Sequence, residues 1–268
     1  MALLTNITHL ILDMDGVLYR GNRPMPRLAE FFAFLRERSI PFTLVTNNGT
    51  RTPQERVVQL AGMGVRLSPS EILVSGKAAA RFLRREFPAG SRVHVFGTPA
   101  LRKALAEEGF TLADEDVRAV VAGLDFEITF DKIRRAVRLI RSGARFIATN
   151  MDPNLPTEGE WLPGTGAMIA MLTVASEVEP TVIGKPEPIM YELAMAQMGA
   201  RPETTAAVGD RVATDIVGGK RASLTTICVL SGASDRSEAE AAGADFIFDD
   251  IGHLLDGWRF ALSARGPA

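Results

Sequence analysis

The sequence predicts an α/β protein built around a parallel sheet, with a second α/β domain inserted into the first. Short apolar runs alternate with longer helical patterns along the whole chain, which is typical of strands joined by crossover helices. The first apolar run does not alternate with polar residues, as expected for a strand buried on both faces of a parallel sheet. Between about residues 81 and 181 the alternation of strands and helices continues over enough elements to form a domain of its own.

The first part of the chain contains two expected helices between three expected strands. In order, these elements are a strand at 9–12, a helix at 27–38, a strand at 42–45, a helix from Thr52 to about Gly64 and a strand at 72–74. The helix at 27–38 carries its apolar residues on one face. The helix after Thr52 begins with the capping-box pattern Thr52-Pro53-Gln54-Glu55, in which proline occupies the first helical position.

The rest of the chain continues this alternation of strands and helices. In the insertion we expect strands at 93–96, 119–122 and 145–148 and helices at 99–108, 130–141 and 166–176. After it we expect a helix at 188–198, a strand at 206–208, a helix at 213–222 and strands at 225–229 and 246–248. An alanine-rich run at 238–242 reads as a solvated helix.

The composition indicates an ordinary globular protein and excludes several functional classes. The 268 residues are 46% hydrophobic and 23% charged, and the formal net charge is −2, which gives no support for binding to nucleic acid or to an anionic membrane. No apolar stretch approaches the roughly 20 residues that span a bilayer. The single cysteine, Cys228, permits no internal disulfide and lies in an apolar run, so we expect a buried structural thiol. We therefore expect a cytoplasmic location.

Two carboxylates follow the first strand, in Asp13-Met14-Asp15-Gly16. In open α/β sheets, ligand sites form beyond the carboxyl ends of the strands, and paired carboxylates there can bind a hard divalent cation. Gly16 permits a sharp turn. The competing interpretation is a pair of solvated turn residues, and this motif alone does not decide between the two.

Three further polar segments also lie at expected strand ends or helix starts. Thr46-Asn47-Asn48 offers a hydroxyl, amides and backbone N–H groups that could bind phosphate oxygens. Lys185, between Gly184 and Pro186, could direct its ammonium at a phosphate. Asp210 follows a strand as Asp13 does and could complete a metal site, while Asp215 could orient its neighbours. Each segment taken alone also fits a polar turn, a surface lysine or a helix-entry carboxylate.

Taken together and in this order, the four segments resemble the four motifs of the haloacid dehalogenase (HAD) superfamily. More narrowly, they resemble its subfamily IIA, the NagD-like, 4-nitrophenylphosphatase-type branch, over nearly the whole chain. The resemblance implies a Rossmann-like parallel-sheet core at residues 1–80 and 182–268 and a large inserted α/β cap domain at 81–181. It also implies a Mg²⁺-dependent phosphatase that acts on a small phosphorylated metabolite, with a homodimer formed through the cap.

The resemblance further implies a role for each motif residue. Asp13 would be the nucleophile that forms an aspartyl-phosphate, and Asp15 would be the general acid and base. Mg²⁺ would be held by Asp13, by the backbone carbonyl of Asp15 and by Asp210, with Asp215 behind them. The residues that would hold the phosphoryl oxygens are Thr46, Asn47 and Lys185.

Two other segments receive a different interpretation. Ser75-Gly76-Lys77-Ala78 lacks the earlier glycine and the Ser/Thr of a phosphate-binding loop and is rejected as one. Asn150 and Asp152 lie in a segment that repeats the strand-then-Thr-Asn pattern without accompanying lysine and aspartate motifs. We expect residues 149–164 to be a cap loop facing the active site, with Asn150 and Asp152 setting specificity. A surface loop of no consequence is the alternative.

Two other functions remain open on this sequence. A phosphomutase or phosphotransferase would pass the phosphoryl group to a second hydroxyl on a sugar phosphate. A phospho-accepting binding module would also combine Asp, Thr, Lys and Mg²⁺ but would not turn over. The physiological phosphomonoester is not identified by any motif.

Overall fold

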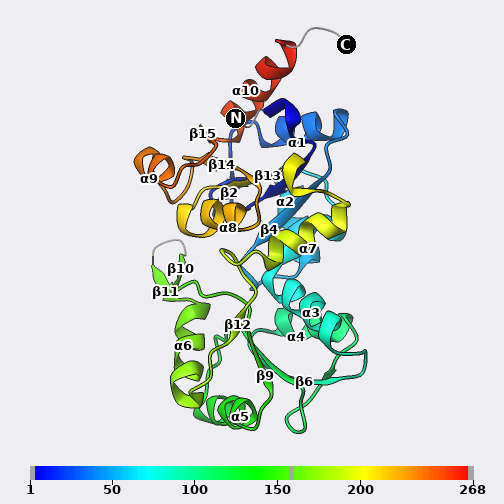
Figure 1. The fold of residues 1–268 in the computed structure, drawn as a ribbon, viewed down its shortest axis with the longest axis vertical. Coiled ribbons are helices and arrows are strands. Elements are labelled where there is room, and N and C mark those ends of the chain that lie inside the picture. The colour runs from blue at the N-terminus through cyan, green and yellow to red at the C-terminus, as the bar shows by residue number, and fades with distance from the viewer. Residues whose placement is uncertain (1–3, 157–159, 265–268) are drawn as a thin grey trace. The chain divides into compact units, whose positions relative to one another are not determined.

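The computed structural model describes residues 4–156 and 160–264 and contains a six-stranded sheet in the order β15-β14-β13-β1-β4-β5 (Figure 1). Its strands are β1 (His9–Leu12), β4 (Phe42–Thr46), β5 (Ile72–Val74), β13 (Thr205–Gly209), β14 (Thr225–Val229) and β15 (Phe246–Phe248). The pairings of β1 with β4 and β13, of β13 with β14 and of β14 with β15 are all parallel. Since β1 and β13 are almost entirely buried, the parallel sheet predicted from the sequence is confirmed.

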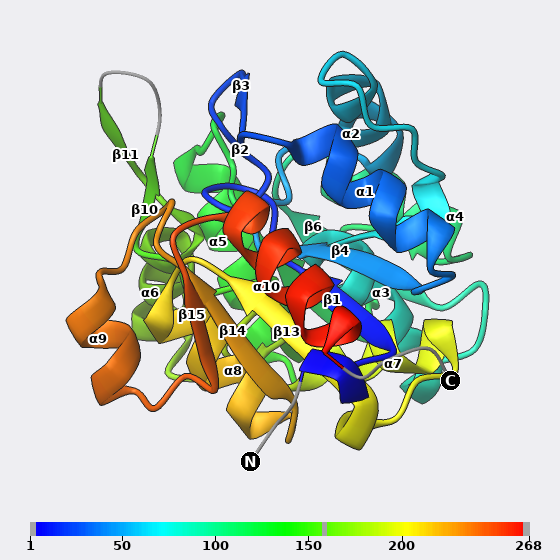
Figure 2. The same ribbon diagram turned by 90° about the horizontal axis from the view of Figure 1, so that it is seen from above.

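Helices connect the strands of this sheet. They are α1 (Leu28–Glu37), α2 (Pro53–Ala61), α7 (Ile189–Met198), α8 (Val217–Arg221), α9 (Arg236–Ala241) and α10 (Ile251–Ser263), with short 3₁₀ turns at Leu4–Asn6, Pro69–Glu71 and Pro202–Thr204. Helices α1 and α10 lie side by side (Figure 2), with the rings of Phe34 and Trp258 edge to face at 5.8 Å. This apolar contact helps to hold α10, which was not expected from the sequence, against α1 in the first unit.

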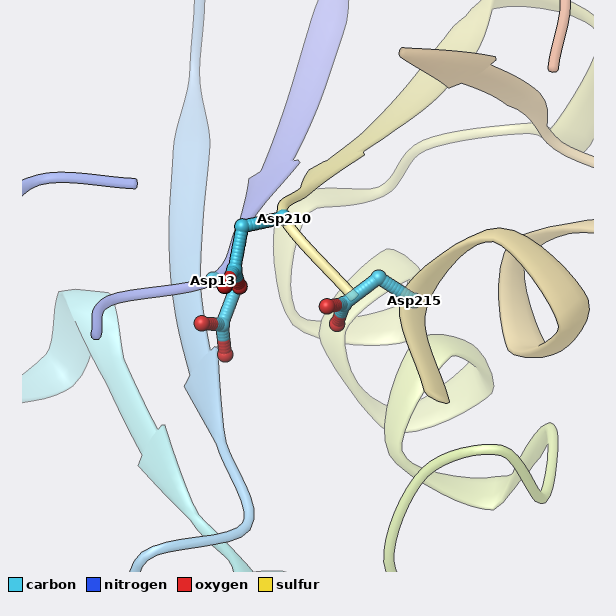
Figure 3. A group of neighbouring side chains, drawn as sticks. All are labelled: Asp13, Asp210 and Asp215. Carbon is cyan, nitrogen blue, oxygen red and sulfur yellow. The ribbon is translucent and has the colours of Figure 1, made fainter. Parts of the chain in front are cut away.

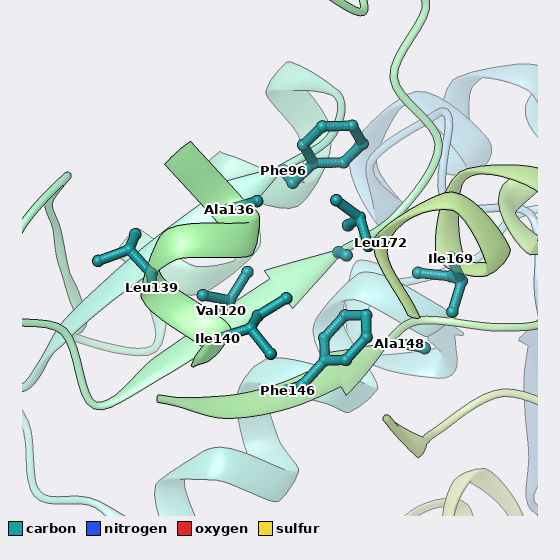
Figure 4. Packing of buried hydrophobic residues seen from close by; sticks show 10 residues of the cluster. Phe96, Val120, Ala136, Leu139, Ile140, Phe146, Ala148, Ile169 and Leu172 are labelled. Atoms are coloured by element: carbon teal, nitrogen blue, oxygen red, sulfur yellow. The ribbon is translucent and has the colours of Figure 1, made fainter. Parts of the chain in front are cut away.

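A second sheet, in the order β12-β9-β8-β6-β7, forms within the inserted segment. Its strands are β6 (Arg92–Phe96), β7 (Thr111–Leu112), β8 (Ala119–Ala122), β9 (Arg145–Ala148) and β12 (Thr181–Val182), and its helices are α3 (Ser75–Glu86), α4 (Pro99–Glu107), α5 (Phe130–Arg141) and α6 (Thr165–Ser176). Figure 4 shows the packing of α5 and α6 on this sheet, where Ile140 and Leu172 belong to the same buried cluster as Phe146. The inserted segment thus has a hydrophobic core of its own.

Several elements differ from the sequence-based expectation. Helix α3 was not expected, because its alanine-rich and arginine-rich sequence follows β5 without a polar cap residue. The segment expected as one helix at 213–222 begins as a π-helix, Val212–Ile216, and continues as α8. The segment expected as a cap loop contains an antiparallel hairpin, β10 (Asn154–Pro156) with β11 (Trp161–Pro163), while its residues 157–159 lie outside the described part of the chain. A second hairpin joins β2 (Tyr19–Arg20) to β3 (Arg23–Pro24).

The chain divides into two compact units. The first comprises residues 1–46, 53–73 and 185–268, and the second comprises residues 47–52 and 74–184. The domain limit expected at residues 80 and 81 falls inside α3, and the units divide before this helix instead. The roles of the two units as catalytic core and specificity cap stay predictions. No helix within residues 4–156 and 160–264 has the length and apolar composition needed to cross a membrane.

Candidate active site

The candidate site lies at the carboxyl ends of β1 and β13, where the strand order of the first sheet reverses. From β1 the chain continues to β4 on one side, and from β13 it continues to β14 on the other. Such a switch point leaves a crevice beyond the strand ends in which ligands bind. Asp13 directly follows β1, and its N–H donates to the carbonyl oxygen of Val208 at 2.8 Å; Asp210 directly follows β13. The topology therefore places both aspartates where a ligand site is expected.

Lys185 connects two of the buried carboxylates. Its Nζ lies 2.5 Å from Oδ1 of Asp13 and 2.6 Å from Oδ1 of Asp215, and it also donates to the carbonyl oxygen of Val45 at 3.3 Å. The side chains of Lys185 and Asp215 are 4% and 5% exposed, and that of Asp13 is 12% exposed. The ammonium of Lys185 therefore bonds both carboxylates at once, and Asp215 helps to position it beside Asp13.

The Asp210 carboxylate accepts a backbone hydrogen bond and fits into space left by two glycines. Its Oδ2 accepts the N–H of Ala233 at 2.8 Å. A β-carbon on Gly16 would lie 2.3 Å from this oxygen, and one on Gly232 would lie 1.9 Å from it. Gly16 also has φ +83°, a conformation that glycine adopts without strain. The two glycines thus make the space that the Asp210 carboxylate occupies.

Carboxylate oxygens of Asp13, Asp210 and Asp215 lie within 4.8 Å of one another (Figure 3). Burial raises the pKa of Asp13 well above its usual value; Lys185 opposes this shift, and the other two carboxylates add to it. Burial and the nearby Asp215 likewise raise the pKa of Asp210 to about 6. Burial acts to lower the pKa of Lys185, but Asp13 and Asp215 outweigh it and hold that pKa well above its usual value. The site therefore favours a charged lysine and disfavours three ionised carboxylates.

Comparison with known proteins identifies the family. Residues 10–111 match the family described as haloacid dehalogenase-like hydrolase, and residues 182–254 match the HAD-hydrolase-like family. The chain is 35% identical over 255 residues to an acid sugar phosphatase of Staphylococcus saprophyticus, which covers 94% of this chain and 98% of that protein. The chain belongs to the haloacid dehalogenase-like hydrolases.

Other relatives of this HAD hydrolase place it within the superfamily. It is 37% identical to a 5'-nucleotidase of Bacillus subtilis, over 84% of this chain and 88% of the relative. It is also 37% identical to a dihydroxyacetone phosphatase of Corynebacterium glutamicum, over 94% and 92% of the two chains.

Solved structures narrow the assignment further. The 4-nitrophenylphosphatase of Thermotoga maritima matches with a TM-score of 0.90 at 32% identity, over 96% of this chain and 99% of the other. NagD from E. coli matches with a TM-score of 0.86 at 34% identity, over 91% and 97%. The fold, a Rossmann-like core with an inserted α/β cap, and the NagD-like branch are thereby confirmed, and this HAD hydrolase is a phosphoric monoester hydrolase.

The remaining motif residues of the HAD hydrolase lie in both units. Asp15 is exposed in the turn after β1 and forms a β-bridge with Tyr19. Thr46 is the buried last residue of β4, the strand that pairs with β1. Asn47, the next residue, belongs to the second unit by its contacts. The first unit thus brings together Asp13, Lys185, Asp210 and Asp215.

Asn150 and Asp152 lie beside Asn47 within the second unit. Nδ2 of Asn150 donates to the carbonyl oxygen of Asn47 at 2.9 Å, and Nδ2 of Asn47 donates to the two carboxylate oxygens of Asp152 at 3.1 and 3.3 Å. The sequence had suggested only a specificity role for these two residues. Their contacts with Asn47 could not be read from the sequence, because 103 positions separate Asn47 from Asn150.

Sequence reasoning also missed several groups that support the site. Gly232 and the backbone N–H of Ala233 hold Asp210, and no motif marks either of them. Tyr191 donates from its hydroxyl to the carbonyl oxygen of Asp215 at 3.2 Å. Ser75, rejected as part of a phosphate-binding loop, donates from Oγ to the carbonyl oxygen of Asn47 at 2.8 Å. Ser75 is the first residue of α3, a helix that was not expected from the sequence.

Proposed function

We propose that the protein is a Mg²⁺-dependent phosphatase that hydrolyses small phosphomonoesters through an aspartyl-phosphate on Asp13. The observation that supports this most strongly is the placement of Asp13 beside Lys185 at the switch point, with Asp210 within reach. A carboxylate nucleophile must be ionised, and it needs nearby positive charge when it approaches a phosphoryl group.

The donor set fits a hard divalent cation. Three carboxylates and one ammonium carry a net charge of −2 when all are ionised (−3 from Asp13, Asp210 and Asp215, +1 from Lys185), and a divalent cation would balance it. Carboxylate and carbonyl oxygens are the ligands that Mg²⁺ prefers. We assign its binding to Asp13, Asp210 and the backbone carbonyl of Asp15. When bound, the ion would neutralise phosphoryl charge and keep Asp13 ionised.

The reaction then proceeds in two displacements. An oxygen of Asp13 attacks phosphorus, the bond from phosphorus to the leaving oxygen breaks, and Asp15 donates a proton to that oxygen. Asp15 next takes a proton from water as the water attacks phosphorus, which releases inorganic phosphate and regenerates the Asp13 carboxylate. Thr46, Asn47 and Lys185 hold the phosphoryl oxygens in both steps.

The substrate class follows from chemistry shared by the relatives. Those named above act, by their names, on sugar phosphates, a nucleotide, dihydroxyacetone phosphate and 4-nitrophenyl phosphate. We propose a small phosphorylated metabolite and water as the acceptor. Release of free phosphate from a panel of such esters, including sugar phosphates, separates this activity from that of a phosphomutase and ranks the substrates.

Asp13→Asn tests the proposal, since it keeps the shape of the side chain but removes the nucleophilic charge. We expect hydrolysis of p-nitrophenyl phosphate to fall to background while the circular dichroism spectrum and melting temperature show a folded protein. Multiple turnovers by Asp13→Asn at the wild-type rate would refute the assignment. Sustained phosphate release by the wild type would also exclude a binding module that holds its phosphoryl group.

A further inference from the structure

We propose that Asp152 is a positioning residue: it acts through Asn47, whose amide it orients, and does not contact the leaving group of the substrate. The proposal rests on the proposed function, in which Asn47 holds phosphoryl oxygens. It concerns contacts made within the second unit, which contains Asn47, Asp152 and their neighbours.

Asn47 is held at its backbone and at its side chain. Its carbonyl oxygen accepts from Oγ of Ser75 at 2.8 Å and from Nδ2 of Asn150 at 2.9 Å. Its own Nδ2 donates to both oxygens of Asp152, at 3.1 and 3.3 Å. The side chains of Asn47 and Asn150 are buried. Groups that meet a transition state must be fixed to about half an ångström, and the backbone and amide contacts supply that restraint.

The carboxylate of Asp152 determines which end of the Asn47 amide faces it. An ionised carboxylate accepts hydrogen bonds but donates none, so it binds the NH₂ end of the amide and excludes the oxygen end. A hydrogen bond to a charged acceptor is also stronger than one between neutral groups. Asp152 therefore selects one of the two orientations that the amide of Asn47 could adopt.

Asp152 is itself positioned by Asn150. Oδ1 of Asn150 accepts the backbone N–H of Asp152 at 3.0 Å, while its Nδ2 donates to Asn47. One buried amide thus connects the backbone of Asn47 with the backbone of Asp152. This arrangement gives both Asn150 and Asp152 hydrogen-bond partners within the protein.

The packing around Asn47 also includes Gly184, the last residue of the second unit. A β-carbon on Gly184 would lie 2.7 Å from Oδ1 of Asn47 and 2.6 Å from Cβ of Asn150. Gly184 immediately precedes Lys185, the residue bonded to Asp13. The packing around Asn47 leaves no room for a β-carbon at position 184, which explains why this residue is glycine.

The test is a double-mutant cycle of Asp152→Ala and Asn47→Ala, with Asp131→Ala as the matched control. Asp131 is a 57% exposed aspartate of the same unit that is bonded to Arg134 and Arg135. We measure kcat and KM for p-nitrophenyl phosphate, a sugar phosphate and a nucleoside monophosphate, together with the inhibition constant of inorganic phosphate. Phosphate has no leaving group, so its inhibition constant reports on the phosphoryl contacts alone.

We expect Asp152→Ala to lower kcat/KM by roughly 10- to 100-fold, the effect of one hydrogen bond to a charged group. The factor should be the same for the three substrates, and phosphate inhibition should weaken with it. In the Asn47→Ala background, Asp152→Ala should change kcat/KM less than about twofold, because coupled residues do not act additively. Asp131→Ala should match the wild type.

Asp152→Asn distinguishes loss of the hydrogen bond from general misfolding. Its amide oxygen can still accept a hydrogen bond from Nδ2 of Asn47. We expect Asp152→Asn to recover part of the activity lost in Asp152→Ala, because its amide can also present its NH₂ end and is uncharged, and equal loss in both variants would overturn the proposal. So would a loss that differs severalfold among the substrates with phosphate inhibition unchanged, which would place Asp152 against the leaving group. A loss that persists in full without Asn47 would also overturn it. Asp13→Asn, assayed in parallel, reports separately on the proposed function.

Discussion

Nζ of Lys185 lies 2.5 Å from Oδ1 of Asp13, although 172 positions separate the two residues in the chain. Lys185 is the first residue of the chain after the inserted unit, and Asp13 directly follows the strand beside the switch point. This contact, with that of Lys185 to Asp215, joins residues from three separate sequence segments into one charged site. Replacing Lys185 should therefore lower the rate of phosphomonoester hydrolysis.

Lys185→Met should lower kcat by roughly 10²- to 10³-fold, the range typical for loss of one group that stabilises transition-state charge. The variant also leaves Asp13 and Asp215 buried without their shared cation. Steady-state kinetics at saturating Mg²⁺ measure the effect, and Lys220→Met, an exposed lysine of the same unit, serves as the control. A loss below about threefold would remove Lys185 from the phosphoryl site.

Gly232→Ala should raise the Mg²⁺ concentration needed for half-maximal activity. Its new β-carbon would lie 1.9 Å from Oδ2 of Asp210, so the carboxylate must move. Gly62→Ala is the control, because a β-carbon there would meet its nearest neighbour, the carbonyl oxygen of Gln59, at an ordinary 3.4 Å. An unchanged Mg²⁺ requirement in Gly232→Ala would argue against Asp210 as a ligand.

Removal of divalent cations should stop hydrolysis, and Mg²⁺ should restore it. Mg²⁺ should also raise the melting temperature of the stripped protein, since a ligand that binds only the folded state adds about 2.7 kcal/mol of stability at 100 times its dissociation constant. Asp210→Ala should lose most of this thermal shift, and Asp256→Ala, a surface aspartate that pairs with Arg27, should keep it. Full turnover in the presence of a chelator would contradict the metal site.

His94 should make the stability of the protein depend on pH. Burial lowers the pKa of His94 below 6.5, although the carbonyl of Ala113 and the carboxylate of Asp114 oppose that shift and Arg135 reinforces it. The folded protein therefore binds fewer protons at His94 than the unfolded chain does, and the stability that neutral His94 contributes is lost as the pH falls below 6.5. The advantage of wild type over His94→Gln in free energy of unfolding should shrink between about pH 7 and pH 5.

His253 supplies the opposite control. Its hydrogen bond to Asp250 raises its pKa, so its contribution is present below pH 6.5 and is lost as the pH rises. The advantage of wild type over His253→Gln should therefore grow slightly as the pH falls. Urea titrations at several pH values measure both trends. Parallel trends for the two variants would contradict the assignment for His94.

The sequence predicted most strands of the two large sheets from their apolar runs and missed the two-residue strands β7 and β12. The strands at 119–122, 145–148, 225–229 and 246–248 and the helix at 130–141 match the structure at both ends. Helix α3 was missed because no polar side chain caps its start. Helix α10 was overlooked although Asp250 caps it. Its apolar residues are also spaced as one helix face, at Ile251, Leu254, Leu255 and Trp258. The hairpin of β10 and β11 lies in a proline-rich segment that reads as a loop when taken locally.

The candidate site was predictable as a set of residues but not as a set of contacts. Motif spacing pointed to Asp13, Lys185, Asp210 and Asp215, and the structure brings them together. The shared lysine, the glycines around Asp210 and the contact of Asp152 with Asn47 depend on strand order and join chain segments between 22 and 194 positions apart. Such contacts leave no periodic pattern in a single sequence.

The most direct test of the central claim is to trap the covalent intermediate. The protein is mixed with phosphorus-labelled p-nitrophenyl phosphate and Mg²⁺, quenched in acid within the first turnovers and digested for mass spectrometry. We predict that the label is found on the peptide that contains Asp13 and is absent from Asp13→Asn. Label on another residue, or steady hydrolysis with no label on the Asp13 peptide, would contradict the account.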